Sequence, residues 1–259
     1  MYATNYFENQ MLNLMRSQNI TAPTTLYLAL FMSNPGDTGT EGTEISYTGY
    51  ARMPISFAAP YQSGSSMILE NAEQISFAEA ASSVGNVTHV AIYDRLTGGN
   101  MLLYAQLESV LTVQANVTPV FRAGAIKWIW SGHLSVYYRT AIMNTLRGSS
   151  CSGFTPYAAF CAGDPTGTGA EFSGNNYARA ALTMGAPEQQ SSGAAQSSNT
   201  SDTMTPQSTG TWGILTYIAI YDAQTNGNVY MVIPIGSTYS ITSGSACGFR
   251  AGGLRVNIN

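Results

Sequence analysis

The two histidines are the first residues to test for catalysis or metal binding, because imidazole titrates near neutral pH and binds metal ions. They are His89 and His133, and no H-x-x-x-H or H-E-x-x-H pair provides a zinc site. The G-x-S-x-G nucleophile elbow is also absent, and residues 148–153 (GSSCSG) resemble it only superficially. Neither G-x-x-x-x-G-K-[ST] nor G-x-G-x-x-G occurs to hold a phosphate. We therefore expect no catalytic, metal-binding or cofactor-binding residues, no cofactor and no enzyme activity.

Two aspartates, Asp94 and Asp222, open turns that carry Thr, Gly and Asn at matching positions. Such a turn has the oxygen atoms to hold Ca²⁺ together with backbone carbonyls. Alternatively, the carboxylate accepts hydrogen bonds from the backbone N–H groups of its own turn. One carboxylate per turn is few for calcium, so we predict the second role.

Arginine and tyrosine residues offer further candidates. Arg122 and Arg250 occur in two Phe-Arg-Ala-Gly segments, where each has the chemistry to pair with a carboxylate, cap carbonyls at a sheet end or contact an assembly partner. The sixteen tyrosines are potential sugar-stacking platforms. Most occupy strand-like positions, however, where a half-buried tyrosine is a good β former.

These recurrences reflect an internal duplication. Each segment has its partner 127 or 128 residues later, and the pairs occur in the same order. Weaker matches at offsets of 130 and 131 join residues 27–31 to 157–161 and Tyr6-Phe7 to Tyr137-Tyr138. We predict two domains, residues 1–131 (the first copy) and 132–259 (the second copy), packed closely because no Pro- or Ser-rich linker separates them. The strongest pairs are Tyr50-Ala51-Arg52 with Tyr177-Ala178-Arg179, residues 88–94 with 216–222, and Phe121-Arg122-Ala123-Gly124 with Phe249-Arg250-Ala251-Gly252.

Each copy is expected to begin with a short helix. Asn5 caps the first in this interpretation, with Glu8 completing a capping box. The remainder has the short apolar runs and regular turns of a mainly β protein, so we predict two tandem β-sandwich (jelly-roll-like) domains. The Ser-, Thr- and Gln-rich stretch Glu188 to Thr211 is predicted to be a mobile loop. Expected strands cover residues 25–32, 52–57, 87–93, 101–107, 117–129, 215–221 and 229–235.

Composition indicates an assembly subunit. Only 9% of the 259 residues are charged, against about 25% in ordinary soluble domains. A surface of hydroxyls and amides has few charges to desolvate, so neighbouring subunits cover it at low cost. The net charge of −4 and scattered basic residues argue against nucleic acid.

Targeting signals are not evident. The N-terminus lacks the basic and apolar regions of a signal peptide, and no apolar run approaches a membrane span. We expect a protein made in a cytoplasm and released by lysis, with no membrane partner. The three cysteines, Cys151, Cys161 and Cys247, are expected to be small buried thiols.

The motif order of the first copy resembles a family of small phage virion proteins labelled tail-fibre-like or minor tail proteins, which typically have one such domain. The second copy matches less well, since its strand at 156–160 reads Pro-Tyr-Ala-Ala-Phe. The resemblance implies a non-catalytic, β-rich virion component. The segments that carry it are residues 5–9 (NYFEN), 12–13, 26–31 (LYLALF), 34–35, 50–52 and 87–94.

Two virion roles remain open. The first expectation is a capsid-decorating (cement) protein that bridges neighbouring capsomers, with the major capsid protein and further copies of itself as partners. The alternative is a tail-tip or tail-fibre component, partnered by tail proteins, that contacts the host surface through residues such as 188–211. A third interpretation, from another class, is a free carbohydrate-binding module.

Overall fold

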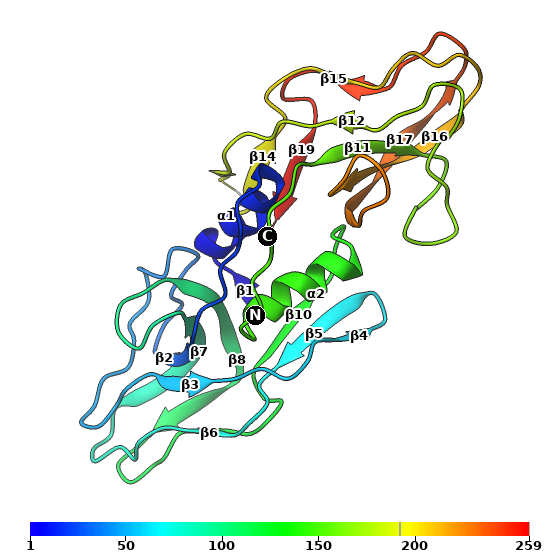
Figure 1. The fold of residues 1–259 in the computed structure, drawn as a ribbon. Helices are drawn as coiled ribbons and strands as arrows, with labels where there is room; N and C mark the ends of the chain where they lie inside the picture. The colour runs from blue at the N-terminus through cyan, green and yellow to red at the C-terminus, as the bar shows by residue number, and fades with distance from the viewer. Residues whose placement is uncertain (192, 259) are drawn as a thin grey trace.

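The two copies are built from matching sheets. The structure, a computed structural model, describes residues 1–191 and 193–258. In the first copy, a five-stranded sheet of order β1-β8-β7-β2-β3 packs with a three-stranded sheet of order β10-β5-β4, and β6 pairs with β9 (Figure 1). The strands are β1 (Tyr2–Ala3), β2 (Leu26–Phe31), β3 (Met53–Ile55), β4 (Tyr61–Ser63), β5 (Ser66–Glu70), β6 (Ile75–Ser76), β7 (Gly85–Tyr93), β8 (Met101–Val113), β9 (Val120–Phe121) and β10 (Lys127–Trp130).

The second copy repeats this plan. A four-stranded sheet of order β12-β11-β16-β17 and a three-stranded sheet of order β13-β14-β19 form its two layers, and β15 pairs with β18. The mainly β fold class, with tandem copies, is therefore confirmed. Its strands are β11 (Tyr157–Cys161), β12 (Ala180–Ala181), β13 (Glu188–Gln189), β14 (Ala195–Ser198), β15 (Thr203–Met204), β16 (Gly213–Tyr221), β17 (Val229–Ile241), β18 (Gly248–Phe249) and β19 (Arg255–Ile258).

The long hairpin of each copy shows how closely the duplication holds. β7 pairs antiparallel with β8, and β16 with β17, as the alternating apolar residues predict. The pairing shifts register between Val87 and His89 in the first hairpin and between Leu215 and Tyr217 in the second. Because a bulge changes strand direction, equivalent bulges give the two hairpins the same bend.

The cap of the first helix is one residue earlier than predicted, so the helix begins at Asn5 itself. α1 (Asn5–Asn13) is capped by Thr4, whose side chain accepts a hydrogen bond from the backbone N–H of Phe7, and a 3₁₀ turn (Leu14–Arg16) follows it. The predicted Asn5–Glu8 capping box is therefore wrong. Glu8 is 1% exposed, and its Oε2 accepts from the backbone N–H of Ala195 in the second copy at 3.0 Å. The Glu8 carboxylate therefore binds the second copy instead of the start of its own helix. Local residue spacing does not reveal this contact between the copies.

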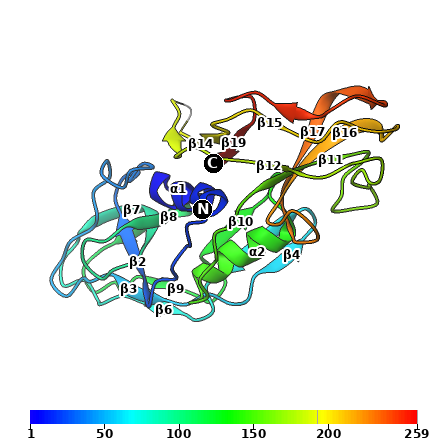
Figure 2. The same cartoon turned by 45° about the horizontal axis from the view of Figure 1, so that its top comes forward.

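Each helix packs across the boundary between the copies. α1 lies between β8 of its own copy and β14 and β19 of the second copy. α2 (Val136–Thr145) lies between β17 of its own copy and β5 of the first copy. Figures 1 and 2 show both helices in the middle of an elongated molecule, between the two lobes. Each three-stranded sheet is thus covered by the helix of the other copy.

Polar contacts fix this exchange of helices. The Tyr230 hydroxyl, on a fully buried side chain of the second copy, donates to the Met11 carbonyl of α1 at 3.0 Å. In the opposite direction, Nη1 of Arg139 on α2 donates to the Ser65 carbonyl at 2.7 Å. Ile20 and Cys151 exchange two backbone hydrogen bonds of 2.8 and 3.0 Å. The prediction that the two copies pack closely is therefore confirmed.

The stretch predicted as a mobile loop instead contains three short strands. Residues 188–211 contain β13, β14 and β15, and Ser197, Asn199 and Ser208 are buried. Ser192 lies outside the described residues. The prediction fails because these small hydroxyl and amide side chains donate hydrogen bonds to backbone carbonyls within the second copy, which the composition of the stretch does not indicate.

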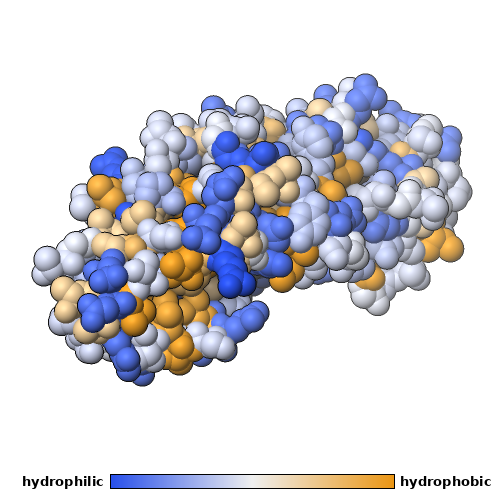
Figure 3. All heavy atoms as spheres, turned by 90° about the horizontal axis from the view of Figure 1, so that it is seen from below, coloured by the Kyte–Doolittle hydropathy of each residue, from blue (hydrophilic) through white to orange (hydrophobic). Residues whose placement is uncertain are grey.

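The surface is mostly weakly polar. In Figure 3, white and pale residues dominate the visible face, and hydrophobic residues gather in the lobe on the left, which is the first copy. Exposed Val120 and Ile129 of the first copy border a groove that also contains Leu107 and Leu111. Over residues 1–191 and 193–258, no helix is long and apolar enough to cross a membrane.

Cutting the backbone between the copies should leave them associated. A protease site inserted between Ser131 and Gly132 would be cleaved because both residues are exposed. The cut copies should stay together because each helix buries its apolar face on the other copy. We expect two fragments by denaturing gel electrophoresis and a single complex by size-exclusion chromatography, with the uncut insertion variant as the reference. Separation of the fragments without denaturant would contradict the helix exchange.

Stability should fall as the pH rises, because burial raises the pKa of Glu8 to about 7. The folded carboxyl keeps its proton above 4.5, the ordinary pKa of glutamate. The stability that this proton adds is therefore complete below pH 4.5 and is lost as the pH rises through 7. We expect the free energy of unfolding in urea to fall by about 2–3 kcal/mol from pH 4.5 to 8.

The matched variant is Glu8→Gln, which keeps the size of the side chain and an oxygen for the Ala195 N–H. Its unfolding free energy should change less over the same pH range. Equal pH profiles for the two proteins would rule out Glu8 as the source.

Candidate functional site

The two histidines lie apart and in different settings. His89 is half-buried on β7, with Nδ1 2.9 Å from the Thr88 hydroxyl, and partial burial lowers its pKa. The equivalent residue in the second copy is Tyr217, which pairs with Cys161 as His89 pairs with Phe31. His133 is exposed in the segment before α2. Among the described residues, no group of three His, Cys, Asp or Glu side chains is placed to hold a metal ion.

Both predicted aspartate turns are closed by hydrogen bonds to their own backbone. Asp94 Oδ1 accepts from the Asn100 N–H at 2.7 Å, and its Oδ2 accepts from the Asn100 side chain at 2.8 Å. Asp222 makes the same two contacts with Asn228, at 2.7 and 3.0 Å. The turn-forming role predicted for both residues is therefore confirmed.

The repeated Tyr-Ala-Arg segment belongs to a half-buried polar cluster that we call the clasp. In the first copy, the Tyr50 hydroxyl accepts from the Leu30 N–H at 3.1 Å and donates to Glu44 at 2.9 Å. Arg52 pairs with Glu44 at 2.8 Å, and its guanidinium lies 3.5 Å from the centre of the Tyr93 ring. Burial raises the pKa of Tyr50 far above its ordinary range, so its hydroxyl keeps its proton. The clasp ties the loop after β2 to the large sheet.

The second copy has the same clasp. Tyr177 accepts from the Phe160 N–H at 3.0 Å and donates to Glu171 at 2.9 Å. Arg179 pairs with Glu171 at 2.7 Å and lies 3.4 Å from the centre of the Tyr221 ring. Glu44 and Glu171 were not singled out in the sequence, although their spacing of 127 residues is the offset of the duplication.

A buried asparagine explains the repeated Phe-Arg-Ala-Gly segments. Asn71 is 1% exposed, donates from Nδ2 to the Arg122 carbonyl at 2.9 Å and accepts at Oδ1 from the Ile126 N–H at 2.8 Å. Asn199 makes the same contacts with Arg250 and Leu254.

The two arginine side chains are themselves exposed. None of the ion pairs in the described part of the chain includes Arg122 or Arg250. The backbone of these segments, rather than the guanidinium, is what the asparagines hold. Asn71 and Asn199 are 128 residues apart, which is the signal that would have found them.

Residues 148–153 join the two copies. The Ser150 hydroxyl accepts from the Ala22 N–H at 3.1 Å, and the Gly153 N–H donates to Asn19 Oδ1 at 2.9 Å. Cys151, Cys161 and Cys247 are buried free thiols, as predicted, and burial raises the pKa of each.

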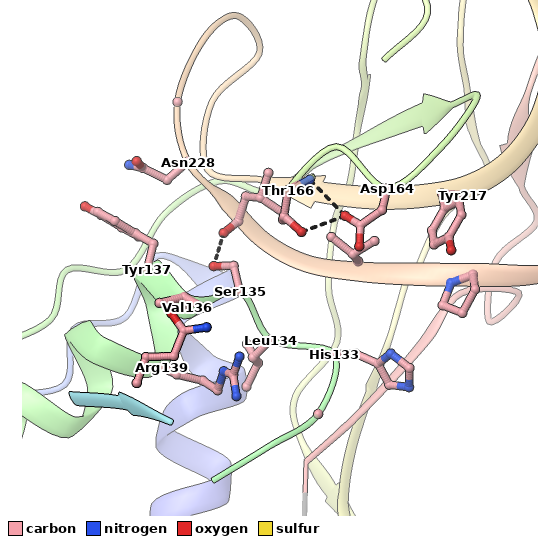
Figure 4. A pocket seen from close by; sticks show the side chains of 16 residues that line it. His133, Leu134, Ser135, Val136, Tyr137, Arg139, Asp164, Thr166, Tyr217 and Asn228 are labelled. Atoms are coloured by element: carbon pink, nitrogen blue, oxygen red, sulfur yellow. Dashed lines mark hydrogen bonds between the residues drawn. The ribbon is translucent and has the colours of Figure 1, made fainter. Parts of the chain in front are cut away.

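A cavity of about 740 Å³ lies beside the N-terminus of α2 (Figure 4). Four segments bound it: the stretch 132–139, the turn after β11, the hairpin formed by β16 and β17, and β4 of the first copy. Asp164 shapes the turn, because its Oδ1 accepts from the N–H and the hydroxyl of Thr166 at 2.8 and 2.6 Å. The polar residues in its wall are Gln62, His133, Tyr137, Arg139, Asp164, Thr166, Tyr217 and Asn228.

The cavity brings a predicted candidate together with residues that the sequence did not single out. His133, Asp164 and Tyr217 lie on the same side of the cavity in Figure 4. Its walls offer aromatic faces and hydrogen-bonding groups, which suit binding of a polar molecule.

Removing one hydroxyl from the clasp should destabilise the protein. Tyr50→Phe leaves the Leu30 N–H and one Glu44 oxygen without this partner, so we expect a loss of about 1–3 kcal/mol in urea unfolding. Tyr177→Phe should cost a similar amount, and the two losses should add. Tyr61→Phe, at an exposed tyrosine, is the control and should change stability by less than about 0.5 kcal/mol. Equal effects at positions 50 and 61 would contradict the role of the clasp.

Comparison with known proteins identifies the family. A family model described as podophage GP4 fiber I protein gp80 matches the chain twice, over residues 2–129 and 133–257. No curated protein matches it. The resemblance to phage tail-fibre-like proteins is thus confirmed at the level of a phage fibre-like structural protein with a tandem duplication. The chain belongs to the family of podophage GP4 fiber I protein gp80.

Proposed function

We propose that this virion protein is a rigid, non-catalytic subunit of a phage tail fibre that contacts the host surface. Its partners are other tail proteins and further copies of itself. The observation that carries the proposal is the helix exchange, which joins the two copies into one elongated body (Figures 1 and 2). A fibre must transmit contact at its tip to the particle without bending at each domain boundary.

A structural role is also consistent with how the recurring polar groups are used. The carboxylates of Glu44, Glu171, Asp94 and Asp222 all hold side chains or backbone N–H groups of the fold. A catalytic carboxylate needs contact with a reacting group. The neutral, hydroxyl-rich surface favours contacts with neighbouring subunits.

The capsid-decorating role, our first expectation from the sequence, is now the weaker alternative. The family description names a fibre protein, which favours the tail over the capsid surface. The low charged fraction supports either location, because both require contacts between subunits.

Immunogold electron microscopy of intact phage tests the location. We expect gold particles confined to the tail, with no labelling of phage that lack the gene. Gold distributed over the head would overturn the tail-fibre proposal and favour capsid decoration.

A further inference from the structure

The first copy fills the space that corresponds to the cavity beside α2. Tyr104 on β8 pairs with Ala91, as Val232 on β17 pairs with Ala219, so Tyr104 and Val232 occupy equivalent positions. The Tyr104 hydroxyl donates to Asp37 Oδ1 at 2.5 Å. Val232 is shorter and has no hydroxyl, so the second copy loses both the volume and the contact.

The loop over this face also differs between the copies. Nine residues lie between Asn34 and Glu44, but six lie between Asp164 and Glu171. The longer loop reaches the start of α1, where the Asn5 N–H donates to the Asp37 carbonyl at 3.2 Å. The shorter loop closes on itself, because the Gly169 N–H donates to the Asp164 carbonyl at 3.0 Å. The cavity therefore lies where the second copy has both a shorter loop and a smaller side chain.

The walls of the cavity suit a ligand rich in hydroxyl groups. Tyr137, Tyr217 and His133 provide ring faces and polar edges, and Tyr137 is 55% exposed. Gln62 and Asp164 supply amide and carboxylate oxygens that accept hydrogen bonds from hydroxyls. Across the described residues, Asp164 Oδ2 has no hydrogen-bond partner.

Arg139 lies in the wall of the cavity as a largely buried side chain. The residue is 5% exposed, and its Nη1 donates to the Ser65 and Trp130 carbonyls. Its Nε is buried without a hydrogen-bond partner within the part of the chain that the structure describes. A volume of about 740 Å³ lies within the range of small-ligand sites.

We propose that this cavity binds a short saccharide from the bacterial surface, with sugar rings against the aromatic side chains and hydroxyls on Asp164 and Gln62. This inference rests on the proposed function and assigns the host contact to the boundary beside α2, where the second copy supplies Asp164 and the first copy supplies Gln62. An apolar ligand would leave these polar groups unpaired, and one carboxylate is too few for a metal ion.

Binding of the labelled full chain to a glycan array tests the inference. The array carries defined fragments of lipopolysaccharide O-chains and of capsular polysaccharides, so that its two arms identify the source of the saccharide. We expect binding to a subset of one arm. No binding to either arm would overturn the inference.

Val232→Tyr gives the second copy the tyrosine that the first copy has at the equivalent position, Tyr104, and should fill the cavity. We expect it to weaken saccharide binding at least tenfold while the circular dichroism spectrum and the melting temperature stay close to those of the parent. Tyr104→Phe, at the equivalent position, is the matched control and should leave binding unchanged. If Val232→Tyr does not fold, the exposed His133→Ala variant replaces it, with the same expected loss. Undiminished binding by the folded variant would overturn the assignment of the cavity.

Adsorption of the labelled chain to host cells separates this inference from the proposed function. A chain that binds cells but no saccharide would leave the proposed function standing and overturn the saccharide site. A chain that binds neither would count against both.

Discussion

The architecture depends on one packing constraint: each three-stranded sheet has an apolar face that the helix of its own copy does not cover. A small sheet is stable only when that face is buried against another layer. Here α1 covers β14 and β19, and α2 covers β5, so each copy completes the core of the other. One hydrophobic cluster accordingly contains residues of both copies. The tandem arrangement is thus a pair of interdependent halves rather than two independent domains joined by a linker.

The two helices make this contact with opposite charges at equivalent positions. Glu8 on α1 accepts from a backbone N–H of the second copy, whereas Arg139 on α2 donates to a backbone carbonyl of the first. Both side chains are buried, which is costly for a charge unless hydrogen bonds compensate it. For Glu8 the cost is reduced by keeping the proton, which is why its pKa lies near 7. Packing at the boundary between the copies is therefore expected to depend on pH.

The two copies keep the same buried polar contacts and differ in the length and sequence of their outer loops. The clasp, the aspartate turn and the buried asparagine have the same partners in both, because removing one partner would leave a buried polar group unpaired. Loops on the outer face carry no such requirement and change length at little cost. The cavity beside α2 occurs at such a place, where a shorter loop and Val232 replace the Asp37–Tyr104 contact.

The sequence alone determined the duplication, the mainly β class, the strands of the two long hairpins and the turn-forming role of Asp94 and Asp222. These features follow from local spacing and alternation, which act within a few residues of the chain. The domain limits of 1–131 and 132–259 stay a prediction. Tertiary structure decided the partners of Glu8 and Arg139, the burial of Ser197, Asn199 and Ser208, and the existence of the cavity. The partners of Glu8 and Arg139 lie far away in the sequence, since Ala195 is 187 positions from Glu8 and Ser65 is 74 positions from Arg139. Such contacts depend on which apolar faces pack against each other in the folded chain. Local sequence patterns do not predict that packing.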